Sequence, residues 1–323
     1  MIDFACKSLA MLVEALSWIG RQGTRAVAAL VIIGIFVPPI GELLRPFVAE
    51  AIFLLLCVSF MRVDLSALRA HLRRPGLILA ATAWTMIVVP LMVGLGSLAT
   101  GFDKQAPELF LGLMLQAMAS PMMATPAFAA LMGFDATLVL ITLVIGTALV
   151  PFTAPLFAYA FFGNLLTLSP LALGLKLFEM LAGSMLVAAA IRLMVGLPAI
   201  ERHKDPIDGV NILFMFVFVT AVMSTVGSTI LAEPLKVIGL TLFAFAVFFA
   251  LLGLTTLIFW KAGYDRAFAV GFTVAQRNIG LMLAATGSVL PGPTWLYFAL
   301  AQFPIYLSPL LLKPMMRAKT SRA

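Results

Sequence analysis

The sequence predicts an all-α polytopic membrane protein in which ten transmembrane helices form two inverted five-helix repeats. Hydrophobic residues make up 63% of the 323-residue chain and charged residues only 11%, whereas soluble domains carry about 25% charged residues. Apolar segments of about 20 residues, each long enough to cross a bilayer, recur along the chain. The fourth and ninth segments are interrupted by residues that disrupt a helix, which is typical of secondary transporters with inverted repeats.

Residues 1–24 are expected to form an amphipathic segment at the inner membrane surface. Charged residues at positions 3, 7, 14 and 21 interrupt the apolar run that a cleaved signal peptide needs. Beyond them we predict a single transmembrane domain made of one repeat over 25–160 and a second over 171–316. Charges, Gly and Pro delimit its spans, which we place at 25–45, 47–63, 75–100, 106–131, 135–160, 171–197, 209–231, 234–261, 267–290 and 293–316.

The basic residues predict how these spans are oriented. Sixteen Lys and Arg fall on the side of the two termini, and the opposite side receives only Arg45, Lys104, Lys176 and Lys236. Because Lys and Arg concentrate in cytoplasmic loops, both termini are expected to be cytoplasmic, in the inner membrane of a bacterium. Membrane topology therefore explains the formal net charge of +7, and nucleic acid is not an expected partner.

Two prolines five residues apart, Pro121 and Pro126, lie within the fourth span. Each removes a backbone donor and clashes with the preceding turn, so we expect this helix to be broken near the middle of the membrane. A simple kink is the alternative, because membrane helices tolerate proline. Ser120 and Thr125 flank the expected break and are candidates for a polar lining.

Arg277, in the ninth span, is the most informative single residue. The nearest charge before it is Arg266, which places Arg277 ~16 Å deep at about 1.5 Å per helical residue. A charge at that depth costs at least ~3 kcal/mol and marks a functional site by default. Gln276, Arg277 and Asn278 in succession would point around most of a helix, so irregular backbone is expected there, with Gly280 as a further hinge.

Arg277 has two interpretations at this stage. It could bind a substrate, with Asn278, Gln276, Thr273, Thr125 and Ser120 completing the polar lining. It could instead be a structural residue that donates to carbonyl groups at helix ends between packed spans. Both can hold together, because a broken helix leaves carbonyl groups that a guanidinium can satisfy.

The sequence contains no pattern typical of an enzyme. Both histidines, His71 and His203, fall in predicted loops, and there is no HExxH, Asp-rich or Gly-rich phosphate-binding motif. Cys6 and Cys57 lack the spacing of metal ligands. We therefore expect neither catalysis, nor a cofactor, nor a metal site.

Three segments make the chain resemble the bile acid:sodium symporter family, within the wider bile acid/arsenite/riboflavin transporter superfamily. They are Phe60–Pro75 with Val88–Leu91; residues 109–155, including Ser120-Pro121, Gly133-Phe134-Asp135 and Pro151; and Gln276–Leu281. The resemblance covers most of the chain. It implies a panel domain and a core domain, two broken helices that cross in the core, and an organic anion as the substrate.

The chain departs from this family where the family binds sodium. Thr273 replaces the usual sodium-binding Glu, Arg277 the neighbouring Gln, Pro126-Ala127 a Ser-Asn pair, and Thr85 a ligand Gln; Asn278 alone keeps the family residue. A guanidinium would repel a sodium ion a few ångströms away by several kcal/mol at an effective dielectric constant of about 20. Sodium coupling through the usual sites is therefore not expected.

Together these features predict a secondary transporter or facilitator that moves a small organic anion, such as a carboxylate, across the bilayer by alternating access. Arg277 would be either a substrate contact or a permanent substitute for the bound cation. Two alternatives stay open. One is a non-transporting membrane receptor or assembly partner on the same scaffold. The other is a sodium- or proton-coupled symporter, for which Asp135 is the nearest candidate carboxylate. The oligomeric state also stays open.

Overall fold

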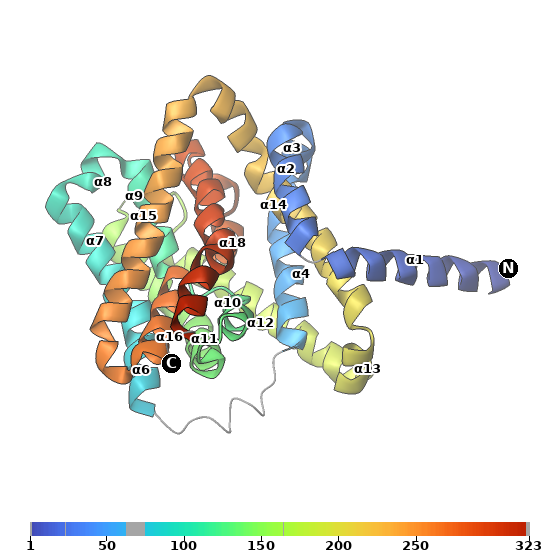
Figure 1. Ribbon diagram of the computed structural model, residues 1–323. Coiled ribbons are helices and arrows are strands. Elements are labelled where there is room, and N and C mark those ends of the chain that lie inside the picture. The colour runs from blue at the N-terminus through green and yellow to red at the C-terminus, as the bar shows by residue number, and fades with distance from the viewer. Residues whose placement is uncertain (1, 23, 63–74, 164, 321–323) are drawn as a thin grey trace. The chain divides into compact units, whose positions relative to one another are not determined.

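The computed structural model describes residues 2–22, 24–62, 75–163 and 165–320, and every regular element within them is a helix (Figure 1). Seven helical stretches in this part of the chain are long and apolar enough to cross a membrane. They are Pro38–Met61, Pro75–Thr100, Ala136–Phe161, Pro170–Val195, Lys204–Ala232, Pro234–Ile258 and Gly292–Leu312. The chain is thus an all-α integral membrane protein, as predicted.

The other three predicted spans are shorter or broken helices. The first contains α2 (Thr24–Phe36). The fourth is divided into α9 (Pro107–Met118) and α10 (Thr125–Leu131), and the ninth into α16 (Tyr264–Ala275) and α17 (Ile279–Thr286). Both predicted interruptions are therefore present, while the number of spans and the inverted repeat stay predictions.

The predicted boundary between the first two spans was wrong. We placed it near Arg45, but α2 ends at Phe36, and the chain continues through α3 (Pro38–Leu44) and a 3-10 turn, η1 (Arg45–Phe47), into α4 (Val48–Met61). The cause is Pro38-Pro39: a residue before proline avoids the helical conformation, and Val37 has φ −125° and ψ 63°. Proline then suits the first turn of the next helix.

The remaining elements follow in chain order. They are α1 (Ile2–Gln22), α6 (Pro75–Ala83), a π-helical turn η2 (Trp84–Val88), α7 (Val89–Thr100), α8 (Phe102–Gln105), α11 (Ala136–Phe161), α12 (Pro170–Val195), α13 (Leu197–Arg202), α14 (Lys204–Ala232), α15 (Pro234–Ile258), η3 (Trp260–Ala262), η4 (Gly287–Val289) and α18 (Gly292–Thr320).

The chain forms two compact units, and each takes segments from both predicted repeats. Unit one comprises Met1–Val63 and Glu179–Ala232, and unit two comprises Asp64–Phe178 and Glu233–Ala323. In unit one, α14 is the central helix and contacts α1, α2, α3 and α4 (Figure 1). These contacts are close: a Cβ atom added at Gly227 of α14 would lie 1.9 Å from the carbonyl oxygen of Ile35.

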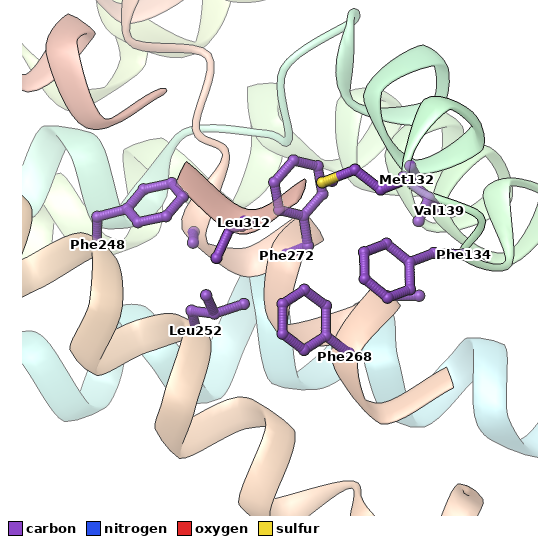
Figure 2. Packing of buried hydrophobic residues seen from close by; sticks show 11 residues of the cluster. Met132, Phe134, Val139, Phe248, Leu252, Phe268, Phe272 and Leu312 are labelled. Carbon is purple, nitrogen blue, oxygen red and sulfur yellow. The ribbon is translucent and has the colours of Figure 1, made fainter. Parts of the chain in front are cut away.

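Unit two contains an aromatic core between α10, α11, α15, α16 and α18. Figure 2 shows Phe134 facing Phe268, with Phe272 and Met132 beside them. The rings of Phe134 and Phe268 stack with centroids 4.5 Å apart. The neighbouring Asp135 caps α11 by accepting from the Leu138 backbone N–H at 3.0 Å, and its carboxylate lies 3.9 Å from Arg266. Asp135 thus has local structural partners.

Candidate functional site

The interruptions of the two broken helices lie side by side within unit two. The backbone N–H of Met122 donates to the Gln276 carbonyl oxygen at 2.9 Å, and that of Asn278 donates to the Ser120 carbonyl oxygen at 2.8 Å. Pro121 and Arg277 consequently face each other in an antiparallel bridge. They occupy a position of the ladder that needs no hydrogen bond between the pair, so the missing N–H of Pro121 leaves no partner unsatisfied. We call this paired segment, residues 119–124 and 276–278, the crossover.

The side chains of Pro121 and Gln276 pack against different helices. The ring of Pro121 packs against α11, where a Cβ added at Gly146 would lie 3.2 Å from Pro121 Cδ. The Gln276 amide donates to the Ile305 carbonyl oxygen at 3.0 Å and to Ser308 Oγ at 2.6 Å, both in α18. The crossover is thus held between α11 and α18.

Arg277 is buried, with 1% of its surface exposed, and its guanidinium binds backbone carbonyl groups. Nε donates to Val274 at 2.7 Å and Nη1 to Ala119 at 2.9 Å, while Nη1 and Nη2 both donate to Thr85 at 3.2 Å. Among the residues that the structure describes, no carboxylate lies within 4.0 Å of this guanidinium. The positive charge is therefore satisfied by dipoles rather than by an ion pair.

Two of these carbonyl groups lack a backbone N–H donor because a helix ends at each of them. Val274 lies in the last turn of α16, and Ala119 directly follows α9 with an extended ψ of 147°. The last carbonyl groups of a helix lack intrahelical partners, and they carry the partial negative charge of the helix dipole. The guanidinium thus binds two helix C-termini that the interruptions have placed inside the protein.

The third carbonyl group, that of Thr85, lacks a backbone N–H donor because of Pro90. In the π-helical turn the backbone N–H of Val89 donates to Trp84 instead of Thr85. The next residue that could donate to Thr85 is Pro90, which has no N–H. The two bonds from Arg277 supply the missing donors, so Pro90 in α7 and Arg277 in the crossover are structurally linked.

Most of the other predicted site residues are also buried. The Thr273 hydroxyl donates to the Ala269 carbonyl oxygen at 2.7 Å. The hydroxyl groups of Ser120 and Thr125 and the amide oxygen of Gln276 have no hydrogen-bond partner among the described residues, although all three residues are fully buried. In this conformation none of these four side chains is open to a ligand.

Asn278 is the one predicted polar site residue that is partly exposed. Its side-chain oxygen accepts from the Leu281 backbone N–H at 3.1 Å and so caps α17, while its amide nitrogen has no partner among the described residues. Of the predicted hinge residues, Pro121 lies in the interruption and Pro126 in the first turn of α10, whereas Gly280 lies inside the first turn of α17.

The interpretation that Arg277 donates to carbonyl groups at helix ends fits Val274 and Ala119, but sequence reasoning did not identify which residues supply the three carbonyl groups. The signal that could have revealed one of them is Pro90, because a proline within a span leaves a carbonyl group of the preceding turn unpaired.

The structure was also searched for a metal site. No group of three or more His, Cys, Asp and Glu that could hold a metal ion occurs in the described part of the chain.

No protein-family model matches this chain, and no curated protein matches its sequence.

Proposed function

We propose that this protein is a secondary transporter that moves a small carboxylate across the bacterial cytoplasmic membrane by alternating access, without sodium coupling and with both termini in the cytoplasm. The observation that carries the proposal is the buried Arg277 guanidinium, bound by three carbonyl groups where two broken helices cross. Broken helices at matching places in two halves are typical of transporter substrate sites. The resemblance to the bile acid:sodium symporter family supports the same class.

The arrangement of Arg277 supports a transporter without sodium coupling. Carbonyl oxygen atoms that converge at helix C-termini are suited to a hard cation such as sodium. Here three carbonyl oxygen atoms, two of them at helix C-termini, are already bound to a guanidinium that is covalently part of the chain. The side chain therefore acts as a permanent substitute for a bound cation, which is the second of the two roles expected from the sequence.

The same charge supports an anion as the substrate. Arginine stays protonated in proteins, and this one has no carboxylate partner within reach in the described part of unit two. Asn278, which follows Arg277 and is partly exposed, offers an amide donor at the N-terminus of α17. A helix N-terminus favours negative charge, so a carboxylate beside Asn278 would meet donors and a positive field together.

Uptake is expected to be independent of sodium. The purified protein in proteoliposomes should take up radiolabelled lactate at equal initial rates, within about twofold, whether sodium or potassium is the external cation, because no mobile cation takes part in binding. Protein-free liposomes provide the background. A steep sodium requirement would contradict the proposal. Thermal stabilisation by lactate without any uptake would favour the receptor alternative instead.

Two substitutions of Asn278 are expected to separate its structural and binding roles. Asn278→Asp keeps an oxygen that caps α17, so thermal stability should be retained, but the added negative charge should raise the KM for lactate about tenfold or more by repulsion. Asn278→Ala should lose about 1 kcal/mol of stability with the cap. Melting temperature and initial uptake rates measure the two effects. An unchanged KM in both variants would exclude Asn278 as a substrate contact.

A further inference from the structure

We propose that this protein is an anion exchanger for monoanions. Its binding site switches rapidly from one side of the membrane to the other only when it holds an anion, in both directions of the cycle. The inference rests on the proposed transport function and adds its mode. It follows from two properties of the crossover, namely that its positive charge cannot dissociate and that no carboxylate of the described residues lies within 4.0 Å of the guanidinium.

The first property is the permanence of the charge. In a carrier that uses a mobile cation, the cation leaves after each delivery, and the empty carrier returns without it. The guanidinium of Arg277 is covalently attached and forms four hydrogen bonds to three carbonyl oxygen atoms. Every state of the transport cycle therefore contains this charge.

The second property is that, in the described part of unit two, no carboxylate forms an ion pair with this guanidinium. Within the described part of unit two, the ion-paired carboxylates have partners elsewhere: Asp135 faces Arg266 at 3.9 Å, and Glu233 lies 3.1 Å from Lys236. The helix C-termini at Val274 and Ala119 contribute dipoles, which stabilise the guanidinium without changing its net charge. The empty crossover thus has a charge of +1, and one bound monoanion makes it neutral.

Because of this charge balance, the empty carrier switches its access slowly from one side of the membrane to the other. When access switches from one side to the other, an uncompensated charge must cross part of the membrane field, whether unit two moves or the aqueous access path changes sides. It must also pass through a state of low dielectric constant, which disfavours a net charge. The loaded carrier is neutral and avoids both penalties. A dianion would leave a charge of −1 and lose this advantage.

The test measures uptake of radiolabelled lactate, a monoanion, into proteoliposomes that contain the full chain. Liposomes preloaded with unlabelled lactate are expected to show initial uptake about tenfold faster than liposomes without internal anion, because the empty carrier must pass through the state of low dielectric constant with its net charge. Preloading with succinate, a dianion, should accelerate uptake less. An inside-negative potassium diffusion potential should slow uptake into empty liposomes, because the returning carrier moves positive charge outward, and should leave exchange unchanged.

Each outcome has a distinct meaning. Equal uptake with and without internal lactate would overturn the exchange mechanism and leave the transport function intact. Exchange that responds to the diffusion potential as strongly as net uptake would overturn the proposed charge balance. Failure to take up either labelled lactate or labelled succinate under all conditions would contradict the transport function itself.

Discussion

Replacing Arg277 with alanine is expected to abolish anion uptake and to destabilise the protein, and added guanidinium ion is expected to restore both in part. The substitution leaves the carbonyl groups of Thr85, Ala119 and Val274 without their donors. Each unpaired buried polar group costs about 1–3 kcal/mol, so a loss of several kcal/mol is expected. It also removes the positive charge of the crossover, on which anion binding depends.

Soluble ligands can separate these two consequences. The space left by the side chain should admit guanidinium, which matches the lost group in shape, donors and charge, at concentrations well below those that unfold proteins. Urea has a similar shape and similar donors but no charge. We expect guanidinium to raise both the melting temperature and the uptake of Arg277→Ala, and urea to raise at most the melting temperature.

Arg266→Ala is the matched control, because Arg266 is partly exposed and its pair with Asp135 is long. Surface ion pairs contribute about 0–1 kcal/mol, so this variant should keep most of its stability and uptake, and guanidinium should not improve either. If urea restores the uptake of Arg277→Ala as well as guanidinium does, the arginine is purely structural and its charge has no role in transport.

The positions of the two helix interruptions could be predicted from the sequence, because their causes are local. Pro121 and Pro126 remove donors from their own helix, and three consecutive polar residues, Gln276 to Asn278, cannot all face one side of a helix. The resemblance to the bile acid:sodium symporter family implied that the two broken helices cross. Whether the whole chain is an inverted repeat stays a prediction, although both compact units draw on both halves.

Among the partners of Arg277, the carbonyl group of Thr85 could not be predicted because it depends on a third helix. The carbonyl group of Thr85 is unpaired only because a π-helical turn moves the Val89 donor to Trp84 and Pro90 cannot replace it. The turn at Val37 was missed for a different reason. We placed the boundary at Arg45 because charges delimit the spans, but a charged residue does not by itself end a helix, whereas consecutive prolines can.

Replacing Gly227 with alanine is expected to destabilise unit one strongly, even though alanine is the better helix former. The Cβ atom would lie 1.9 Å from the carbonyl oxygen of Ile35 and 3.0 Å from its carbon atom. These are backbone atoms near the end of α2, so no side chain can rotate away, and α2 and α14 would have to separate. Overpacking of this kind costs about 1–3 kcal/mol or more.

Gly239→Ala provides the matched control for this prediction, because Gly239 also lies within a long helix, α15, and a Cβ atom there would meet nothing within 4 Å. That variant should be as stable as the natural chain or gain up to about 1 kcal/mol from helix propensity. Melting temperatures in detergent measure both effects. Because unit one does not contain the crossover, lactate should still raise the melting temperature of the Gly227→Ala protein that folds. If the two variants have equal melting temperatures, α2 does not pack against α14 at Gly227.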